Sequence, residues 1–187
     1  MGDLLIVGAG GHGRVVAETA ELCGEWDTIA FLDDRTDVDR VLGHRIIGKM
    51  DEYEQFADEY KYAIVCIGDN EKRLDLIEKL VKSGYKVPVI IHPRAAVSKY
   101  CDIGDGSVIL AGAVINTSTS IGKGCIINIH ACVDHDCVLG DGVHVCSGGV
   151  VRSGCRVGGL SYIGAGACVK AGSDLIEKYI LQDGMVI

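Results

Sequence analysis

The sequence predicts two different folds in series, a small α/β domain over residues 1–93 and a parallel β-helix over residues 94–187. Two patterns indicate this division. In the first half, apolar strand-like runs alternate with helix-like segments, which is typical of a parallel sheet covered by helices. In the second half, aliphatic residues recur at every sixth position, a period that fits neither an α-helix nor a simple hairpin meander.

The first domain opens with the apolar strand "DLLIVGAG", followed by "GGHGRVVAETAELCG", whose helical spacing ends at Gly24. Further strands are expected at "TIAFLDD" and "YAIVCIG". Helices are expected on either side of the second of these, at "MDEYEQFADEY" and "NEKRLDLIEKLVKSG", and "VPVIIHP" closes the domain. The first half is therefore predicted to form a small Rossmann-like domain with a parallel sheet.

A glycine pattern directly follows the first strand. Gly8, Gly10 and Gly13 satisfy G-x-G-x-x-G, and Asp33 follows Gly13 by twenty residues. Taken alone, this is the fingerprint of a dinucleotide site, with phosphate at a helix N-terminus and the acid on a ribose. The domain is only about half the size of a full dinucleotide fold, and nothing after it resembles a hydride-transfer site. We therefore expect a nucleotide ligand without NAD, and an NAD-dependent oxidoreductase is the less favoured alternative.

The second half carries the strongest pattern. From Asp102 to Ser173 the sequence reads in blocks of six, such as "VINTST SIGKGC IINIHA CVDHDC VLGDGV", and the second residue of every block is aliphatic. These predicted core positions are Val97, Ile103, Ile109, Ile115, Ile121, Ile127, Val133, Leu139, Val145, Val151, Val157, Ile163 and Val169. The last residue of each block is always Cys, Ser, Ala, Thr, Val or Gly, which predicts a tight turn without room for bulk. Both features are typical of a β-helix in which stacked coils share one core.

Nine cysteines invite a disulfide or zinc interpretation, but their placement favours a simpler one. The chain has no C-x-x-C pair. Cys101, Cys125, Cys137 and Cys155 all occupy the small position of the six-residue block. We therefore expect these cysteines to be small buried residues and expect no metal site.

Composition excludes some classes of partner. The formal net charge of −8 disfavours nucleic acid, because phosphate binding needs a basic surface. No apolar run approaches the roughly 20 residues that span a bilayer. Asp3 lies where a signal peptide would carry basic residues. The expectation is a cytoplasmic protein without a membrane span.

The repeat resembles the hexapeptide acyltransferase superfamily, whose members form a left-handed triangular β-helix with three blocks per coil. The order of motifs, "LLIVGAGGHGRVVAE", "FLDD", "CIGDN" and then "VDHDC", is similar over nearly the whole chain to the NeuD-type sialic acid O-acetyltransferase family. That family includes PglD-like N-acetyltransferases that act on nucleotide-linked 4-amino sugars. The resemblance implies a homotrimer with active sites between subunits, acetyl-CoA as co-substrate and a nucleotide-sugar substrate.

Acyl transfer to an amine or hydroxyl needs a base, and neutral histidine suits this near pH 7 when a carboxylate orients its ring. His135 and Asp136 fall between the inward Val133 and the small-site Cys137, at the corner of a coil. The resemblance aligns the family's base with His135 and its helper acid with Asp136. A solvated turn histidine is the alternative.

The resemblance also implies binding residues. For acetyl-CoA they are His144, half a coil after His135, and Ala165. For the nucleotide sugar they are Gly11, His12, Gly13, Asp33, Asp34 and Gly68. The glycines and His12 are expected around the phosphates, and Asp33 and Asp34 near the base and ribose. A capping or turn role is the alternative for the two acids.

These expectations combine into an acetyltransferase that moves acetyl from acetyl-CoA to the amino group of a nucleotide-linked, UDP-type 4-amino sugar for surface glycan assembly. One alternative keeps the fold and acetylates a sialic acid hydroxyl. Another is a non-catalytic nucleotide-sugar-binding scaffold, suggested because the repeat weakens from about residue 174. Leu175, Leu181 and Ile187 keep the six-residue spacing there, but Tyr179 replaces a small residue.

Overall fold

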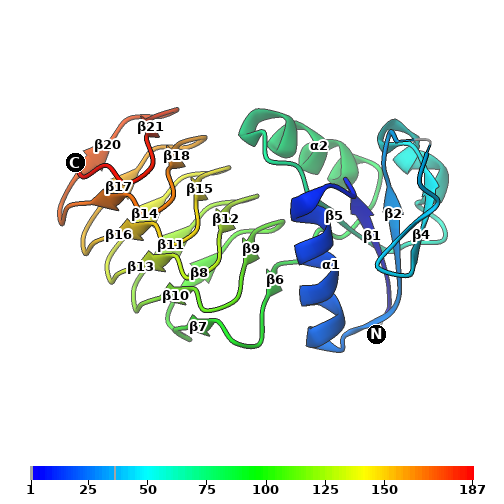
Figure 1. Ribbon diagram of the computed structural model, residues 1–187, viewed down its shortest axis with the longest axis horizontal. Coiled ribbons are helices and arrows are strands. Elements are labelled where there is room, and N and C mark those ends of the chain that lie inside the picture. Colours follow the sequence, from blue (N-terminus) through cyan, green and yellow to red (C-terminus); the bar gives the residue numbers. More distant parts are fainter. Residues whose placement is uncertain (1, 36) are drawn as a thin grey trace. The chain divides into compact units, whose positions relative to one another are not determined.

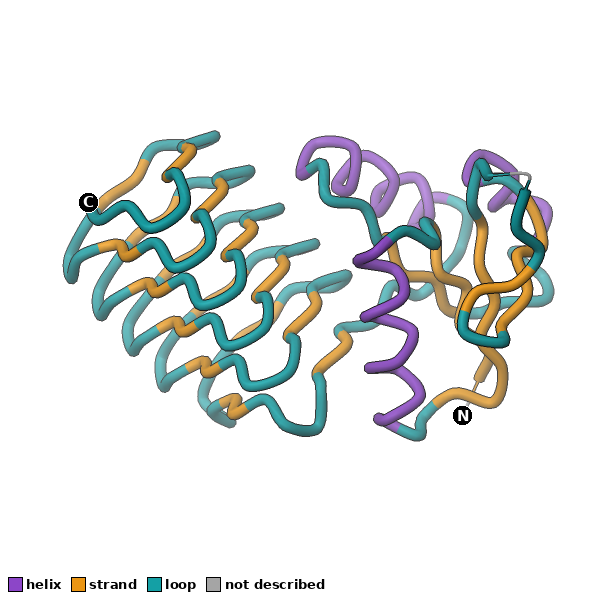
Figure 2. The backbone as a smooth tube through the Cα atoms, in the orientation of Figure 1, coloured by secondary structure: helices purple, strands orange, loops and turns teal. Residues whose placement is uncertain are grey.

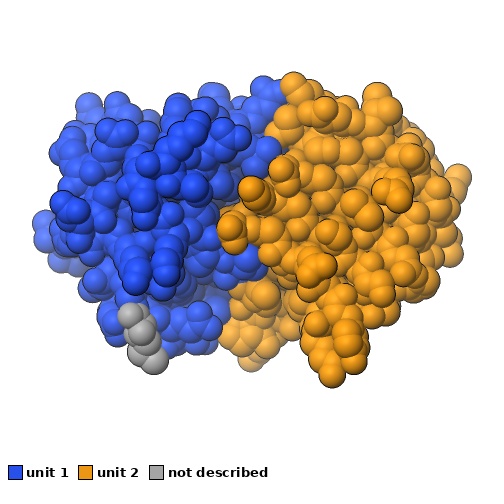
Figure 3. All heavy atoms as spheres, turned by 180° about the vertical axis from the view of Figure 1, so that it is seen from behind, with its two compact units in different colours: residues 1–90 blue, residues 91–187 orange. Residues whose placement is uncertain are grey.

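The computed structural model describes residues 2–35 and 37–187, in two compact units, Met1–Ile90 and Ile91–Ile187 (Figures 1 and 3). The first unit contains a five-stranded sheet in the order β3-β4-β2-β1-β5. Its elements are β1 (Gly2–Val7), α1 (Gly11–Cys23), β2 (Trp26–Leu32), β3 (Arg40–Val41), β4 (His44–Gly48), the 3-10 helix η1 (Met50–Phe56), β5 (Tyr62–Val65) and α2 (Asn70–Lys82).

The predicted α/β class of the first unit is confirmed, with three differences in detail. The sheet is parallel from β4 to β5, but its edge carries the antiparallel strand β3, which was not predicted. The helix expected from Met50 is the 3-10 helix η1. The segment "VPVIIHP" does not add a strand to this sheet, because its only strand, β6 (Ile90–Ile91), pairs within the β-helix.

The glycine-rich loop joins β1 to α1 through a close backbone contact. The backbone N–H of Gly8 donates to Leu32 at 2.8 Å, which ties the loop to the end of β2. Gly13, in the first turn of α1, lies so close to this loop that a Cβ atom would be 1.9 Å from the carbonyl oxygen of Gly8. The third glycine of the pattern is therefore needed for packing the helix against the strand.

The second unit is a β-helix in which two-residue strands form three parallel sheets, shown in Figure 2 as short strands joined by loops. Face 1 contains β7 (Ala96–Val97), β10 (Val114–Ile115), β13 (Cys132–Val133), β16 (Val150–Val151) and β19 (Cys168–Val169). Face 2 contains β8 (Asp102–Ile103), β11 (Ser120–Ile121), β14 (Val138–Leu139), β17 (Arg156–Val157) and β20 (Asp174–Leu175). Face 3 contains β6, β9 (Val108–Ile109), β12 (Ile126–Ile127), β15 (His144–Val145), β18 (Tyr162–Ile163) and β21 (Ile180–Leu181).

The core of the β-helix confirms the six-residue prediction. All thirteen predicted aliphatic positions belong to one hydrophobic cluster, and only Val97 and Ile103, in the first coil, are partly exposed. Strand partners are 18 residues apart, as in Val133 opposite Val151, so three blocks make one coil. Each coil therefore covers the apolar residues of the coil before it, which is the main source of stability in such repeats.

The small positions also form hydrogen bonds. The thiols of Cys125, Cys137 and Cys155 each donate to a carbonyl oxygen fifteen residues later, at 3.0–3.3 Å. The hydroxyl of Thr119 does the same and also accepts the N–H of Cys137. These residues satisfy backbone groups that the tight corners would leave unpaired. Cys125, Cys137 and Cys155 are buried, as predicted, whereas Cys101, in the first coil, is partly exposed.

The last coil keeps its backbone register although its sequence departs from the repeat. β20 pairs with β17, and β21 pairs with β18, in the same register as earlier coils. Ile187 exchanges two backbone hydrogen bonds, with Cys168 and Lys170. Tyr179, in the small position, packs partly buried against the core cluster. The stacked β-helix thus continues through residue 187.

Candidate active site

The His135–Asp136 pair lies at the corner between face 1 and face 2, between β13 and β14. Asp136 has a φ of 59°, the left-handed conformation that Asp adopts more readily than most residues. The bend brings its Oδ2 atom to 2.7 Å from Nδ1 of His135. Both side chains are exposed, by 48% and 65% respectively. The structure therefore brings together the two residues predicted as base and helper acid.

The hydrogen bond with Asp136 is the largest influence on the histidine and raises the pKa of His135 above its ordinary value. Desolvation acts in the opposite direction, and the charges of Asp134 and Asp136 add to the increase in the pKa of His135. When Nδ1 carries the proton and donates to Asp136, the lone pair is on Nε2. Nε2 is then the atom that can accept a proton from a substrate.

His144 lies in β15 on face 3. Its ring meets Tyr162 of the next coil edge to face, with centroids 5.3 Å apart. Its Nε2 atom is 3.5 Å from Sγ of Cys146. Its side chain is partly exposed on the outer surface of the β-helix, since Val145 is the inward residue of the strand.

Within one chain, the structure does not bring His135 and His144 together. The β-helix has three faces, and the corner between faces 1 and 2 is opposite face 3. Ala165 lies at the corner between face 3 and face 1, after β18, and its backbone N–H donates to Oδ1 of Asp183 at 2.8 Å. The two predicted cofactor residues are therefore on the far side of the coil stack from His135.

The predicted substrate residues of the first unit gather at one edge of its sheet. They follow the carboxyl ends of β1, β2 and β5, which are neighbours in the order β2-β1-β5. Gly11, His12 and Gly13 form the first turn of α1, which begins without a side-chain cap. Gly68 follows β5, and open space surrounds the position of a Cβ there. This edge is where ligands bind in open parallel sheets.

His12 is a partly buried histidine that is neutral near pH 7. Burial lowers the pKa of His12 to about 4, with a further contribution from the charge of Arg73. Its Nε2 atom is shielded from solvent and has no hydrogen-bond partner among the described residues. A buried polar atom without a partner costs about 1–3 kcal/mol.

Asp33 and Asp34 hold backbone groups in this structure. Oδ2 of Asp33 accepts the N–H of Ala9 at 2.7 Å, and its Oδ1 accepts Nε of Arg35 at 2.7 Å. Burial favours the neutral acid, but these hydrogen bonds prevail and lower the pKa of Asp33. Asp34 accepts the N–H of Met50 at 3.1 Å. Both acids thus contact the backbone of neighbouring loops, and Asp33 holds the glycine-rich loop. Their role in ligand binding stays a prediction.

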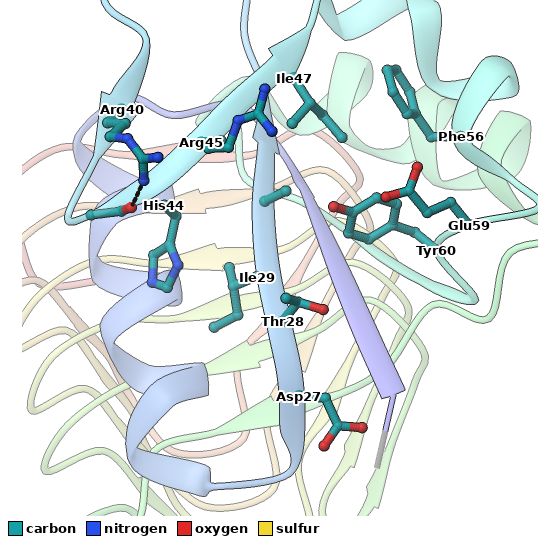
Figure 4. Close-up of a pocket in the computed structure, with 12 residues that line it drawn as sticks. Asp27, Thr28, Ile29, Arg40, His44, Arg45, Ile47, Phe56, Glu59 and Tyr60 are labelled. Carbon is teal, nitrogen blue, oxygen red and sulfur yellow. Dashed lines mark hydrogen bonds between the residues drawn. The ribbon is translucent and has the colours of Figure 1, made fainter.

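A separate cavity of about 620 Å³ lies in the first unit, over the amino-terminal half of β2 and over β4. Figure 4 shows Arg40, Arg45, Glu59 and Tyr60 around it. It contains none of the predicted substrate residues, which lie at the opposite ends of the parallel strands.

Two negative findings concern the described residues only. No three His, Cys, Asp or Glu side chains within them lie close enough together to hold a metal ion. Among those same residues, no helix has the length and apolar character needed to cross a membrane.

Sequence reasoning missed two polar residues beside the predicted base, His135. Asp134 accepts the backbone N–H of His135 at 2.8 Å with Oδ1, and the same oxygen accepts Nδ2 of Asn116 at 3.1 Å. The signal was present, because residues 116 and 134 are 18 apart and therefore adjacent on consecutive coils. It becomes visible only once the coil length is known.

The chain is similar to known proteins in sequence and in structure. Residues 3–80 match the family model described as PglD N-terminal domain. The acetyltransferase domain of PglB from Neisseria gonorrhoeae is 38% identical with a TM-score of 0.96, over 100% of this chain and 91% of that one. The same domain has been solved in complex with acetyl coenzyme A, at 38% identity and a TM-score of 0.94, over 99% of this chain and 92% of that one.

The names of two further relatives describe enzymes or complexes with nucleotide-linked sugars. Perosamine N-acetyltransferase from Caulobacter crescentus, solved as a His-to-Asn mutant with CoA and GDP-perosamine, is 34% identical with a TM-score of 0.94, over 100% of this chain and 89% of that one. UDP-N-acetylbacillosamine N-acetyltransferase from Bacillus subtilis is 35% identical over 114 residues, 59% of this chain and 52% of that protein. The match thus spans about half the length of that curated relative.

The sequence matches and the structural matches identify the same family. The glycine-rich α/β unit matches a family model, and identity above 30% extends over both units and nearly all of two solved relatives. The chain belongs to the PglD/PerB-like family of sugar N-acetyltransferases with a hexapeptide β-helix.

Proposed function

We propose that this protein transfers the acetyl group of acetyl-CoA to the amino group of a nucleotide-linked 4-amino sugar, with His135 as general base. The observation that carries the proposal is the His135–Asp136 pair, exposed at a β-helix corner in a chain of this family. The relatives support it, because two are named as N-acetyltransferases and one is solved with acetyl coenzyme A.

The chemistry follows from the two ring nitrogens. Nε2 of His135 takes a proton from the sugar amine as its nitrogen adds to the thioester carbonyl. The carbon–sulfur bond of the tetrahedral intermediate then breaks and expels CoA thiolate. Asp136 holds the ring through Nδ1 and stabilises the imidazolium that forms. Acetyl-CoA is a co-substrate here, and the proposal needs no NAD and no metal.

The proposed site lies between subunits of a homotrimer. Because His135 and His144 are on opposite sides of one β-helix, a single chain cannot place the base beside the proposed acetyl-CoA contacts His144 and Ala165. A neighbouring copy can supply them.

Mixing subunits tests this arrangement. His135→Ala subunits, unfolded and refolded together with His144→Ala subunits, should regain activity at low acetyl-CoA, because some mixed sites carry both native histidines. Two inactive variants that stay inactive after subunit exchange, verified by native mass spectrometry, would contradict a shared site.

The first unit is proposed to bind the nucleotide sugar at the carboxyl edge of its sheet. The uncapped N-terminus of α1 suits phosphate, and the unpartnered Nε2 of His12 favours a ligand group that completes its hydrogen bonding. Gly11 and Gly68 leave the backbone exposed there, whereas Gly13 is buried and lets α1 approach the loop closely. Asp33 and Asp34 hold the loop and are proposed to lie near the base and ribose.

A thiol-release assay with acetyl-CoA and UDP- or GDP-linked 4-amino sugars tests the proposed activity. We expect CoA release that depends on the sugar nucleotide. Absence of release with every sugar of this class would refute the proposal. Both nucleotides belong in the test, because the relatives' names include a UDP-sugar enzyme and a GDP-perosamine complex.

The two alternatives predict different binding. A sialic acid O-acetyltransferase should be stabilised against heat by sialic acid and not by sugar nucleotides. A non-catalytic scaffold should bind the sugar nucleotide in calorimetry without binding acetyl-CoA. The regular backbone of the last coil disfavours the scaffold, because the coil whose loss suggested it is formed.

Replacing Asp136 by Asn should change the pH dependence of the reaction. The base must be neutral, and because hydrogen bonding to Asp136 raises the pKa of His135, activity in the native protein should rise with pH through a value above 6.5. In Asp136→Asn the pKa of His135 falls, so the acid limb of the kcat/KM profile should move to lower pH. At high pH kcat should fall, since the ring is less basic and less well oriented. An acid limb that stays in place would show that Asp136 does not tune the base.

A further inference from the structure

A carboxylate next to His135 on the other side has no part in the proposed chemistry. Oδ1 of Asp134 accepts the backbone N–H of His135 at 2.8 Å and Nδ2 of Asn116 at 3.1 Å. The backbone N–H of Asp134 donates to Val151 of the next coil at 2.9 Å. Asp134 is thus tied to the coils on both sides, and it closes the turn from which the His135 ring projects.

Part of this corner is common to the whole β-helix. The hydroxyl of Thr119 donates to the carbonyl of Asp134 at 2.7 Å and accepts the N–H of Cys137 at 3.2 Å. Ser107 and Ser161 make the same pair of contacts at corners that carry no histidine. The hydroxyl clamp therefore belongs to the fold and says nothing about catalysis.

The contact between Asn116 and Asp134 is different, because it joins side chains of two coils directly under the base. Oδ1 of Asn116 also accepts the N–H of Thr117 at 2.8 Å, which fixes the amide so that Nδ2 faces Asp134. Hydrogen bonds from the N–H of His135 and from Asn116 hold the pKa of Asp134 below its ordinary value, so it is ionised at neutral pH.

We propose that Asn116 and Asp134 are positioning residues for His135: Asn116 anchors the Asp134 carboxylate, and Asp134 fixes the turn that directs the imidazole toward the substrate. This inference rests on the proposed role of His135 as base. Asp134 and Asn116 touch neither substrate nor acetyl-CoA in it. They act through the backbone of His135 and through the charge beside its ring.

Several charged side chains lie near the His135 ring, and the test must distinguish the effect of Asp134 from the effects of the others. Asp134 and Asp136 on the turn both raise the pKa of His135. Arg152, one coil later, acts on Asp134. At the same corner, the neighbouring coils place Thr117 and Ser153, which carry no charge. Asp134→Asn removes one charge but keeps the acceptor oxygen, whereas Asp134→Ala removes both.

The test combines steady-state kinetics with an NMR titration of the His135 ring in the resting protein. In Asp134→Ala we expect kcat to fall about ten- to a hundredfold, in line with the cost of misplacing a catalytic group, with an unchanged KM for acetyl-CoA. Asp134→Asn should recover most of kcat at high pH. The His135 titration midpoint should move to lower pH in both variants. Asn116→Ala should lower kcat in the same direction, by less.

Asp141→Ala is the matched control. Oδ1 of Asp141 also accepts a backbone N–H at a corner, at 2.8 Å, but that N–H belongs to Lys123 and not to a histidine. Its removal should leave kcat and the His135 titration unchanged. The proposal is overturned if folded Asp134→Ala keeps native kcat and a native His135 titration, or if Asp141→Ala matches it in both. If the native protein shows no acetyl transfer, the proposed function fails, and the titration still decides whether Asp134 acts on the ring.

Discussion

The variant His135→Ala should fold, assemble as the native protein does and lose about 10²- to 10⁴-fold in kcat, which is the usual contribution of a general base. The substitution removes the imidazole and leaves the inward Val133 and the small-site Cys137 in place. The His135 side chain is exposed and its ring hydrogen-bonds to Asp136, so little packing is lost. The KM for acetyl-CoA should stay near its native value.

Stopped-assay kinetics together with circular dichroism check this result. His130→Ala is a useful comparison, because His130 also lies at a β-helix corner in the left-handed conformation, with φ of 55°. It should retain turnover if it is structural. A folded His135→Ala protein with near-native kcat would remove the general base from the mechanism.

The variant Gly13→Ala should have the largest effect on the first unit. An added Cβ would lie 1.9 Å from the carbonyl oxygen of Gly8 and 3.6 Å from Cβ of Cys66. Backbone must move to relieve this, because neither atom of the Gly8 carbonyl is at the end of a flexible side chain. Overpacking of this kind costs about 1–3 kcal/mol and occasionally more. The loop that precedes α1 should shift, and sugar-nucleotide affinity should fall with stability.

Gly10→Ala is the matched control for this prediction. Gly10 is the N-cap of α1, with φ of −68°, and nothing lies within 4 Å of its Cβ position. Thermal unfolding and calorimetry with a UDP-linked sugar should therefore show a large loss for Gly13→Ala and a small one for Gly10→Ala. Equal losses in the two variants would mean that the close contact at Gly13 is not what holds the loop.

The sequence could predict the β-helix in detail because its pattern is periodic. Large aliphatic residues at every sixth position are buried when the chain forms stacked coils around one core. Val133, Val151 and Val169 stack one above another as expected. The first unit was less predictable. β3 has only two residues, and its pairing with β4 depends on the turn at Leu42 and Gly43, which have positive φ values.

The site shows the same contrast. His135 and Asp136 could be predicted because their contact is local and the corner conformation favours it. The predicted role of Asp33 near the ligand stays a prediction, but its hydrogen bond from the N–H of Ala9, 24 residues away in sequence, could not be predicted. Asn116 was missed for a similar reason. Contacts between distant residues depend on the stacking of coils and strands, which a local pattern does not contain.

Product analysis tests the central claim most directly. The protein is incubated with acetyl-CoA carrying a ¹³C-labelled acetyl group and with a UDP- or GDP-linked 4-amino sugar, and the sugar nucleotide is examined by mass spectrometry and NMR. We predict one amide-linked labelled acetyl group on the 4-amino nitrogen for each CoA released, and its near absence with His135→Ala. CoA release without acetylated sugar, labelled acetyl on a hydroxyl, or no transfer to any sugar of this class would contradict the account.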